Sequence, residues 1–197
     1  MVDAAGSHIS KVERIFRVLL SRKIPDLTWY RIAKEADVSY GWAHRVLKGF
    51  ETRRLIKGTE IIEPRELFQL WASRKDLRVY REYHVQDPSA FLKSADLKFA
   101  FTGYFAESLV GHYLFPRYME IYIYQNEARR WNDLITKSGY VGKGNLQVIV
   151  ADEHVFFESD RVSGSPLVSI QQLIVDLYRT GAECTEAADL LVQRWYA

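Results

Sequence analysis

Residues 32–62 read IAKEADVSYGWAHRVLKGFETRRLIKGTEII, and the predicted fold depends on this stretch. Ser39 is a residue type that commonly caps the start of a helix. The helix that follows has its apolar residues at the three- and four-residue spacing of a single buried face, which comprises Ala43, Val46, Leu47 and Phe50. Just before Ser39, Asp37 and Val38 indicate a turn that separates this helix from an earlier one.

Two further helices are predicted on the N-terminal side. Thr28 is expected to cap the nearer one, whose inward residues are Ile32, Ala33 and Ala36. Ser10 and Glu13 form a capping box that predicts a first helix beginning at Ser10, with an apolar stripe of Val12, Ile15, Phe16 and Leu19. Pro25 prevents this helix from continuing. Three short helices with a tight turn between the second and third follow the helix-turn-helix plan.

Residues 55–62 predict a hairpin of two short strands around the two-residue turn Gly58-Thr59. A hairpin directly after the third helix is a wing. The string from Ile32 to Gly41, with Val46-Leu47 and the Arg53–Ile56 entry to the hairpin, resembles bacterial and archaeal winged-helix regulators over roughly a third of the chain. The resemblance implies a winged helix-turn-helix that binds double-stranded DNA.

The charges of the chain are unevenly distributed. Residues 1–75 hold 15 Lys or Arg against 9 Asp or Glu, a net charge of +6, whereas residues 76–197 carry a net charge of −4. This asymmetry indicates two modules with different partners, of which the basic one is the candidate for nucleic acid. The alternative is that the excess of positive charge is an ordinary solvated surface.

The face of the third helix opposite its apolar residues carries the predicted DNA contacts. Arg45 can pair bidentately with the O6 and N7 atoms of guanine, Lys48 suits a phosphate, and Gly41 permits close approach of the helix to DNA. Trp42 either contacts DNA or folds back into the core. The full predicted set of DNA-binding residues adds the helix starts and the wing: Thr28, Arg31, Ser39, Tyr40, Gly41, Trp42, His44, Arg45, Lys48, Arg53, Arg54 and Lys57. A winged helix that docks on another protein is the alternative.

A second domain is predicted from residue 76 to residue 197, after a first domain of residues 1–75. A helix that begins at Pro64 joins the two, because no flexible linker composition appears between them. Strands are expected over residues 77–85, 98–102, 119–124 and 146–150, with a further one near 155–157. Helices are expected from Gly103 to about 113, from 126 to 137, from a capping box at Ser169 and Gln172, and from 185 to 195. The predicted fold class is α+β, with a mixed α/β second domain.

The second domain also follows the core plan of the minimal nucleotidyltransferase fold, in which a strand, a glycine and a helix are followed by a strand that bears a carboxylate. The matching positions are Gly103-Tyr104 and Glu120-Ile121-Tyr122, so the second domain resembles a degenerate member of that fold. One carboxylate does not build a two-metal site. We therefore expect no enzyme, no catalytic or metal-binding residue and no cofactor. Asp176 is interpreted as the partner of Arg179, the alternative being a remnant catalytic acid.

The whole arrangement resembles the AbiEi-type antitoxins of type IV toxin–antitoxin systems. The segments that carry this likeness are residues 101–106, 113–124, 166–169 and 173–177. The resemblance implies a DNA-binding transcriptional regulator, often of its own operon, beside a toxin. The candidate partners are double-stranded DNA, a cognate toxin protein and a second copy of the chain. A nucleotidyltransferase with a nucleic-acid-binding N-terminal domain, and an adaptor that binds proteins through both modules, are the alternative functions.

The remaining sequence features bear on cellular location. No stretch approaches the ~18 consecutive apolar residues that suggest a membrane span, and the first residues lack the pattern of a signal peptide. Cys184 is the single cysteine, which excludes an intramolecular disulfide and a cysteine-based zinc cluster. We expect a cytoplasmic protein without a membrane partner.

Overall fold

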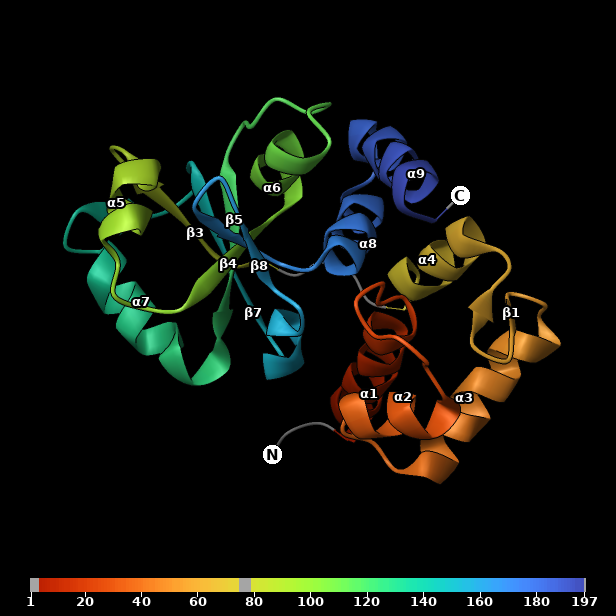
Figure 1. Cartoon of the computed structure of the whole chain (residues 1–197). Coiled ribbons are helices and arrows are strands. Elements are labelled where there is room, and N and C mark those ends of the chain that lie inside the picture. Colours follow the sequence, from red (N-terminus) through yellow and green to blue (C-terminus); the bar gives the residue numbers. More distant parts are fainter. Residues whose placement is uncertain (1–3, 75–78, 197) are drawn as a thin grey trace. The chain divides into compact units, whose positions relative to one another are not determined.

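The computed structural model describes residues 4–74 and 79–196 of the chain, and its secondary structure is mixed α+β, as predicted (Figure 1). The chain divides into two compact units. The first comprises residues 1–76 together with residues 191–197, and the second comprises residues 77–190. The sequence predicts a second domain that runs to residue 197, whereas the last seven residues group with the first unit.

The first unit contains four helices and a short hairpin among its described residues before position 75. They are α1 (Ala4–Leu19), α2 (Trp29–Glu35), α3 (Tyr40–Thr52), β1 (Ile56–Lys57), β2 (Glu60–Ile61) and α4 (Pro64–Ala72). Both predicted caps are present, since the Thr28 hydroxyl accepts a hydrogen bond from the amide of Arg31 and the Ser39 hydroxyl accepts one from the amide of Trp42.

The predicted start of the first helix is wrong. Helix α1 begins at Ala4, so Ser10 lies inside the helix and does not cap it. Ala4 and Ala5 favour a helix, and no proline separates them from Ser10, so the helix extends past the residue that could have started it.

The core of the first unit forms around the apolar face of α1. The Phe16 ring lies 4.6 Å from the Phe50 ring of α3 and is stacked on Trp71 of α4 at 5.5 Å. At the C-terminal end of the last helix, the Tyr196 hydroxyl donates a hydrogen bond of 2.6 Å to the carbonyl oxygen of Leu20. The predicted inward residues of the three helices are buried, except that Val46 is only half-buried.

The second unit is built on a seven-stranded mixed sheet with the order β6-β3-β7-β5-β4-β9-β8. Its strands are β3 (Val79–Val85), β4 (Phe99–Thr102), β5 (Met119–Tyr124), β6 (Gly139–Val141), β7 (Leu146–Ala151), β8 (Asp160–Val162) and β9 (Ser165–Leu167). Its helices are α5 (Pro88–Ser94), α6 (Gly103–Val110), η1 (Gln125–Glu127), α7 (Ala128–Ile135), η2 (Glu153–Phe156) and α8 (Ile170–Thr180), and α9 (Glu183–Tyr196) follows. The neighbours of β5 run in opposite senses, β7 parallel and β4 antiparallel to it.

Two local predictions for this unit are wrong. The strand expected near residues 155–157 is replaced by η2, because the Asp152 side chain accepts a hydrogen bond from the amide of His154 and starts a helical turn. The Ser169 side chain makes no capping hydrogen bond. Its expected partner Gln172 instead directs its amide group to the carboxylate of Asp176, which lies on the same helix.

Helices cover both faces of the sheet, with α5 and α7 on one face and α6 and α8 on the other (Figure 1). The first and last residues of β4 point to opposite faces, as an odd separation along a strand requires. The Phe99 ring packs edge-on against Trp131 of α7 at 5.7 Å, whereas the Thr102 hydroxyl contacts Asp176 of α8. None of the helices in residues 4–74 and 79–196 has the length and apolar character needed to cross a membrane.

Candidate functional site

The outward face of α3 brings together six of the twelve residues predicted to contact DNA. Ala43, Leu47 and Phe50 are buried on the inner face. Tyr40, Gly41, His44, Arg45 and Lys48 are exposed, and Trp42 is half-buried beside them. An idealised Cβ atom at Gly41 would meet no heavy atom within 4 Å, so the surface above this residue is open.

Arg45 has the properties expected of a residue that contacts a ligand directly. Its side chain is exposed, and its guanidinium carbon lies 5.8 Å from the centre of the Trp42 ring. No carboxylate of the described residues forms an ion pair with it. The half-buried Trp42 ring therefore forms a platform beside Arg45, and the guanidinium keeps hydrogen-bond donors available for an incoming acceptor.

Lys48 differs from Arg45 because it already has an acidic partner. Its ammonium lies 2.7 Å from the Oε2 atom of Glu51. The other oxygen of Glu51 accepts a hydrogen bond of 3.2 Å from the amide of Gly58, in the turn of the β1–β2 hairpin. These two hydrogen bonds, the one with Lys48 first, lower the pKa of Glu51 and keep it ionised. A phosphate that approached Lys48 would have to share it with Glu51.

Three of the predicted contacts serve the helix starts. The hydroxyls of Thr28 and Ser39 accept capping hydrogen bonds, although both residues are exposed and each hydroxyl still has a proton to donate. Arg31 donates a hydrogen bond of 2.7 Å to the carbonyl oxygen of Pro25. Its role in the free protein is thus to hold the loop before α2.

A group of aromatic side chains, Trp29, Tyr30, Tyr40 and His44, lies beside the outward face of α3 and is called the aromatic cluster below. Tyr30 is 69% exposed and Tyr40 is 50% exposed, and their rings lie 6.4 Å apart. The His44 ring lies 6.0 Å from Tyr40 and 5.0 Å from Trp29.

Trp29 and Tyr30 are not among the contacts predicted from the sequence, although the sequence contains a signal for them. Thr28 caps α2, so both residues belong to its first turn, and the buried set of that helix does not include Tyr30. Trp29 has a structural role as well, because its indole nitrogen donates a hydrogen bond of 2.8 Å to the carbonyl oxygen of Gly58.

The hairpin adds positive charge next to these residues. Gly58 has a φ of +63°, as the first central residue of a type II′ turn requires, and the register pairs Ile56 with Ile61. Lys57 is exposed and faces Glu60 across the hairpin. Arg53 and Arg54, at the end of α3, are exposed and form no ion pair with the described acidic residues.

The second unit contains two buried carboxylates, the first of which is Asp176 of α8. Its carboxylate accepts hydrogen bonds from the Thr102 hydroxyl at 2.7 Å, the Gln172 amide at 2.9 Å and the Tyr122 hydroxyl at 3.0 Å. The predicted ion pair with Arg179 is confirmed at 3.5 Å. Burial raises the pKa of Asp176 in spite of these partners. The polar cluster is therefore closed on itself, with each Asp176 oxygen engaged by protein groups.

The second carboxylate, Glu120 of β5, lies against the start of α6. Its Oε2 atom accepts a hydrogen bond of 3.0 Å from the amide of Tyr104. Gly103 has a φ of +58°, and a Cβ atom there would lie 1.6 Å from the same oxygen, so only glycine fits. Burial, with a smaller contribution from the charge of Asp176, raises the pKa of Glu120 to about 7 against the opposing effect of the Tyr104 amide.

The sequence predicts that Tyr122 stands where a nucleotidyltransferase-like core would have its second carboxylate. Tyr122, two residues after Glu120, points its hydroxyl at Asp176. Among the residues that the structure describes, no His, Cys, Asp and Glu side chains form a group able to hold a metal ion. Asp152 caps η2, and Glu153 is exposed. The structure thus brings Glu120 to Gly103 without a second carboxylate beside it on the strand.

Comparison with family models, with curated proteins and with solved structures gives no significant match for this chain.

We predict that Glu120 makes the stability of the protein fall as the pH rises. Its carboxyl keeps its proton up to about pH 7 in the folded state but releases it near its ordinary pKa of 4.5 in the unfolded state. The stabilisation is complete below that ordinary pKa and is lost as the pH rises to about 7, by roughly 3 kcal/mol. Glu120→Gln removes the titrating group, so its free energy of unfolding should depend less on pH in this window.

The measurement is urea unfolding, followed by circular dichroism, at several pH values between 4.5 and 7.5. Glu153→Gln is the control, because Glu153 is exposed and should keep the wild-type pH profile. Parallel pH profiles for Glu120→Gln and the wild type would contradict the prediction, because they would show that Glu120 has the same pKa in the folded and unfolded states.

Proposed function

We propose that the chain is a DNA-binding transcriptional regulator whose first unit is a winged helix-turn-helix with α3 as its reading helix. The observation that carries this proposal is the exposed Arg45 on the outward face of α3, which forms no ion pair with a described acidic residue and lies next to the open surface above Gly41. In this motif the N-terminal part of the second helix of the turn enters the major groove. An arginine at that place is suited to the paired acceptors on the edge of guanine.

The hairpin supports the same proposal as a rigid wing. Trp29 binds the carbonyl oxygen of Gly58, and Glu51 binds its amide, so the turn is fixed to both α2 and α3. Lys57, Arg53 and Arg54 place charge on or beside this wing, where it can contact phosphates. The aromatic cluster adds flat side chains beside the reading helix, and the tyrosine hydroxyls can donate to phosphate oxygens.

We further propose that the second unit is a degenerate minimal nucleotidyltransferase core and that the protein is an autoregulating antitoxin. The resemblance to the nucleotidyltransferase core is supported by the order of three features: strand β4, the glycine at the start of α6, and the antiparallel strand β5 with Glu120. A carboxyl whose pKa is raised to about 7 is a poor ligand for magnesium at neutral pH, and this favours a binding role over catalysis. A cognate toxin and a second copy of the chain are the proposed protein partners of the regulator.

The proposal is tested by the salt dependence of duplex binding. We expect the logarithm of the affinity to fall linearly with the logarithm of the salt concentration, by about 0.9 for each phosphate that the protein neutralises. Fluorescence anisotropy of a labelled duplex selected from a random pool provides the measurement. No duplex affinity at low salt would overturn the proposal. Transfer of nucleotides to nucleic acid in the presence of magnesium, lost in Glu120→Ala, would favour the enzyme instead.

Arg45 and Lys48 should contribute in different ways to DNA binding. Arg45→Ala should cost about 1–3 kcal/mol at one base position and relax the preference there, because a base-edge contact is lost. Lys48→Ala should weaken binding to all sequences alike and lower the salt slope by about one unit, because a phosphate contact is lost. Both variants should be measured on the selected site, on a one-base variant of it and on random duplex.

Neither substitution should unfold the protein, since both side chains lie on the exposed face of α3. Thermal unfolding of each variant provides this control. Unchanged affinity in both variants would mean that α3 is not the reading helix, and the wing around Lys57 would become the main candidate.

Two glycines of α3 offer a matched test of close approach to DNA. A Cβ atom added at Gly41 or at Gly49 meets no heavy atom within 4 Å, so alanine fits at both positions in the free protein. Alanine also favours the helix over glycine, by up to about 1 kcal/mol in a helix interior. We expect Gly41→Ala to keep or raise the melting temperature yet weaken duplex binding, because the added methyl group separates the helix from the groove.

Gly49→Ala is the control, since Gly49 lies two turns further along the helix. It should keep or raise the melting temperature and leave duplex affinity unchanged. Equal affinities of the two variants and the wild type would show that the backbone at Gly41 does not approach DNA closely.

A further inference from the structure

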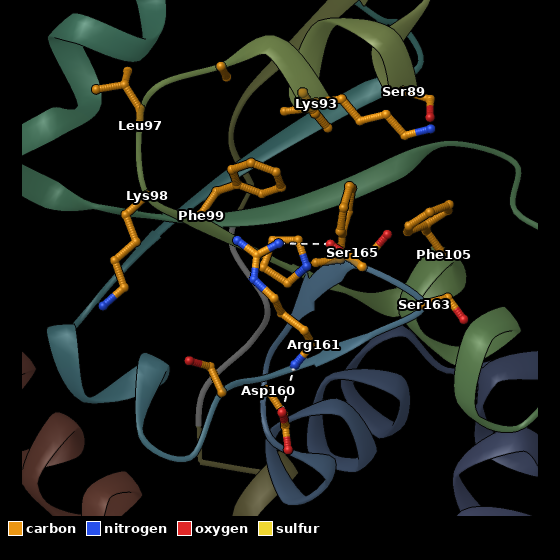
Figure 2. Close-up of a pocket in the computed structure, with 16 residues that line it drawn as sticks. Ser89, Lys93, Leu97, Lys98, Phe99, Phe105, Asp160, Arg161, Ser163 and Ser165 are labelled. Carbon is orange, nitrogen blue, oxygen red and sulfur yellow. Dashed lines mark hydrogen bonds between the residues drawn. The ribbon is translucent and has the colours of Figure 1, made fainter.

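The second unit contains a pocket of about 850 Å³ that the proposed function does not use (Figure 2). It is bordered by α5, by the loop that leads into β4, by the start of α6 and by the β8–β9 hairpin. Its volume lies within the range of about 300–1,000 Å³ that is usual for small-molecule sites. All of its lining residues belong to the second unit.

Three phenylalanines give the pocket a flat apolar wall. The Phe101 ring lies 5.2 Å from Phe99, on the same strand, and 4.4 Å from Phe105 at the start of α6. Phe99 and Phe105 are half-buried, so part of each ring remains accessible. Aromatic rings that are partly exposed in this way can stack on a planar ligand.

Positive charge surrounds this wall. Lys93, Lys98 and Arg161 line the pocket, and Asp160 is the acidic residue among its lining side chains. Figure 2 shows Lys93 of α5 and Arg161 of β8 on either side of the Phe99 ring. The second unit comes from the part of the sequence with a net negative charge, so this concentration of cations is a local exception.

The cations and the carboxylate are engaged in different ways. Arg161 donates one hydrogen bond, of 2.8 Å, to the carbonyl oxygen of Gly164 and keeps its other guanidinium donors. The Asp160 carboxylate accepts a hydrogen bond from the backbone amide of Arg161. Lys93 forms no ion pair with a carboxylate of the described residues. The Lys98 ammonium lies 5.2 Å from the centres of the Tyr124 and Phe156 rings.

The hairpin that carries Arg161 is tightly constrained. Its turn residues Ser163 and Gly164 have φ values of +51° and +81°, the pattern of a type I′ turn, and Val162 pairs with Ser165. Arg161 is thus held by both a regular hairpin and its own hydrogen bond. Ser163 and Ser165 line the same side of the pocket and add hydroxyl groups that donate and accept hydrogen bonds.

We propose that this pocket binds a mononucleotide, with the base on the wall of Phe99, Phe101 and Phe105 and the phosphate between Lys93 and Arg161. A flat ring joined to an anionic group is the ligand chemistry that satisfies both parts of the pocket. The serine hydroxyls can bond to the sugar or to the base edge. The pocket lies on the opposite face of β4 from the buried carboxylates. Phe99, whose ring contacts Phe101, packs against Trp131 of α7, whereas the Thr102 hydroxyl contacts Asp176 of α8. The site does not depend on the proposed DNA-binding function.

The test is isothermal titration calorimetry of the full chain with AMP, CMP, adenosine and inorganic phosphate. We expect both nucleotides to bind more tightly than adenosine or phosphate alone. Arg161→Gln and Lys93→Gln should each weaken nucleotide binding at least about tenfold, as the loss of a charge-assisted hydrogen bond requires. Phe105→Leu should weaken nucleotide binding and leave the weak binding of phosphate unchanged.

Arg129→Gln is the matched control, because Arg129 is an exposed arginine of α7 that does not line the pocket. Thermal unfolding shows whether each variant remains folded. The proposal is overturned if no nucleotide binds, if Arg161→Gln and Lys93→Gln bind as Arg129→Gln does, or if phosphate binds as tightly as AMP. It is also overturned if single-stranded oligonucleotides bind at these residues while mononucleotides do not.

Discussion

The Trp29 indole and the Glu51 carboxylate hold the turn at Gly58 from two sides, and the position of the hairpin against α2 and α3 depends on this pair of hydrogen bonds. One bond comes from the start of α2 and the other from the end of α3, so the two helices and the hairpin form one body. Glu51 has a second partner in Lys48, which lies one turn earlier on α3. The hairpin and the outward face of α3 are therefore linked electrostatically. An anion that drew Lys48 away would leave Glu51 with the Gly58 amide alone.

The two buried carboxylates of the second unit illustrate different solutions to one physical problem. A buried charge is costly unless it is paired, so it must be either compensated or neutralised by a proton. Asp176 receives hydrogen bonds from three neutral side chains and lies beside Arg179. Glu120 accepts one hydrogen bond, from the backbone amide of Tyr104, and has a pKa of about 7. It therefore retains its proton over much of the acidic pH range.

Features set by neighbouring residues in the chain could be predicted from the sequence. The caps at Thr28 and Ser39, the apolar faces of three helices and the turn at Gly58 depend on local spacing, and they are present. The exposed position of Arg45 follows from the same helical period. The predicted capping box at Ser169 is absent because the Gln172 side chain instead donates a hydrogen bond to Asp176. The other polar partners of Asp176 include Thr102 and Tyr122, which lie on strands distant in the sequence. The pocket of the second unit could not be predicted from local spacing either. The parallel pairing of Phe101 with Leu167 brings β9, and with it Arg161, close to the phenylalanines.

Net charge alone is a weak guide to where this protein meets anions. In the first unit, part of the positive excess is neutralised locally, because Arg14 lies 2.9 Å from Asp37 and Lys48 lies 2.7 Å from Glu51. Four exposed cations form no ion pair with a described acidic residue, and they lie on α3, directly after it and on the hairpin: Arg45, Arg53, Arg54 and Lys57. In the second unit the overall charge has the opposite sign, yet Lys93 and Arg161 border a single pocket. The electrostatic field that an anion meets is therefore determined by which cations lack acidic partners and by where the fold places them. The net charge of a sequence segment shows neither.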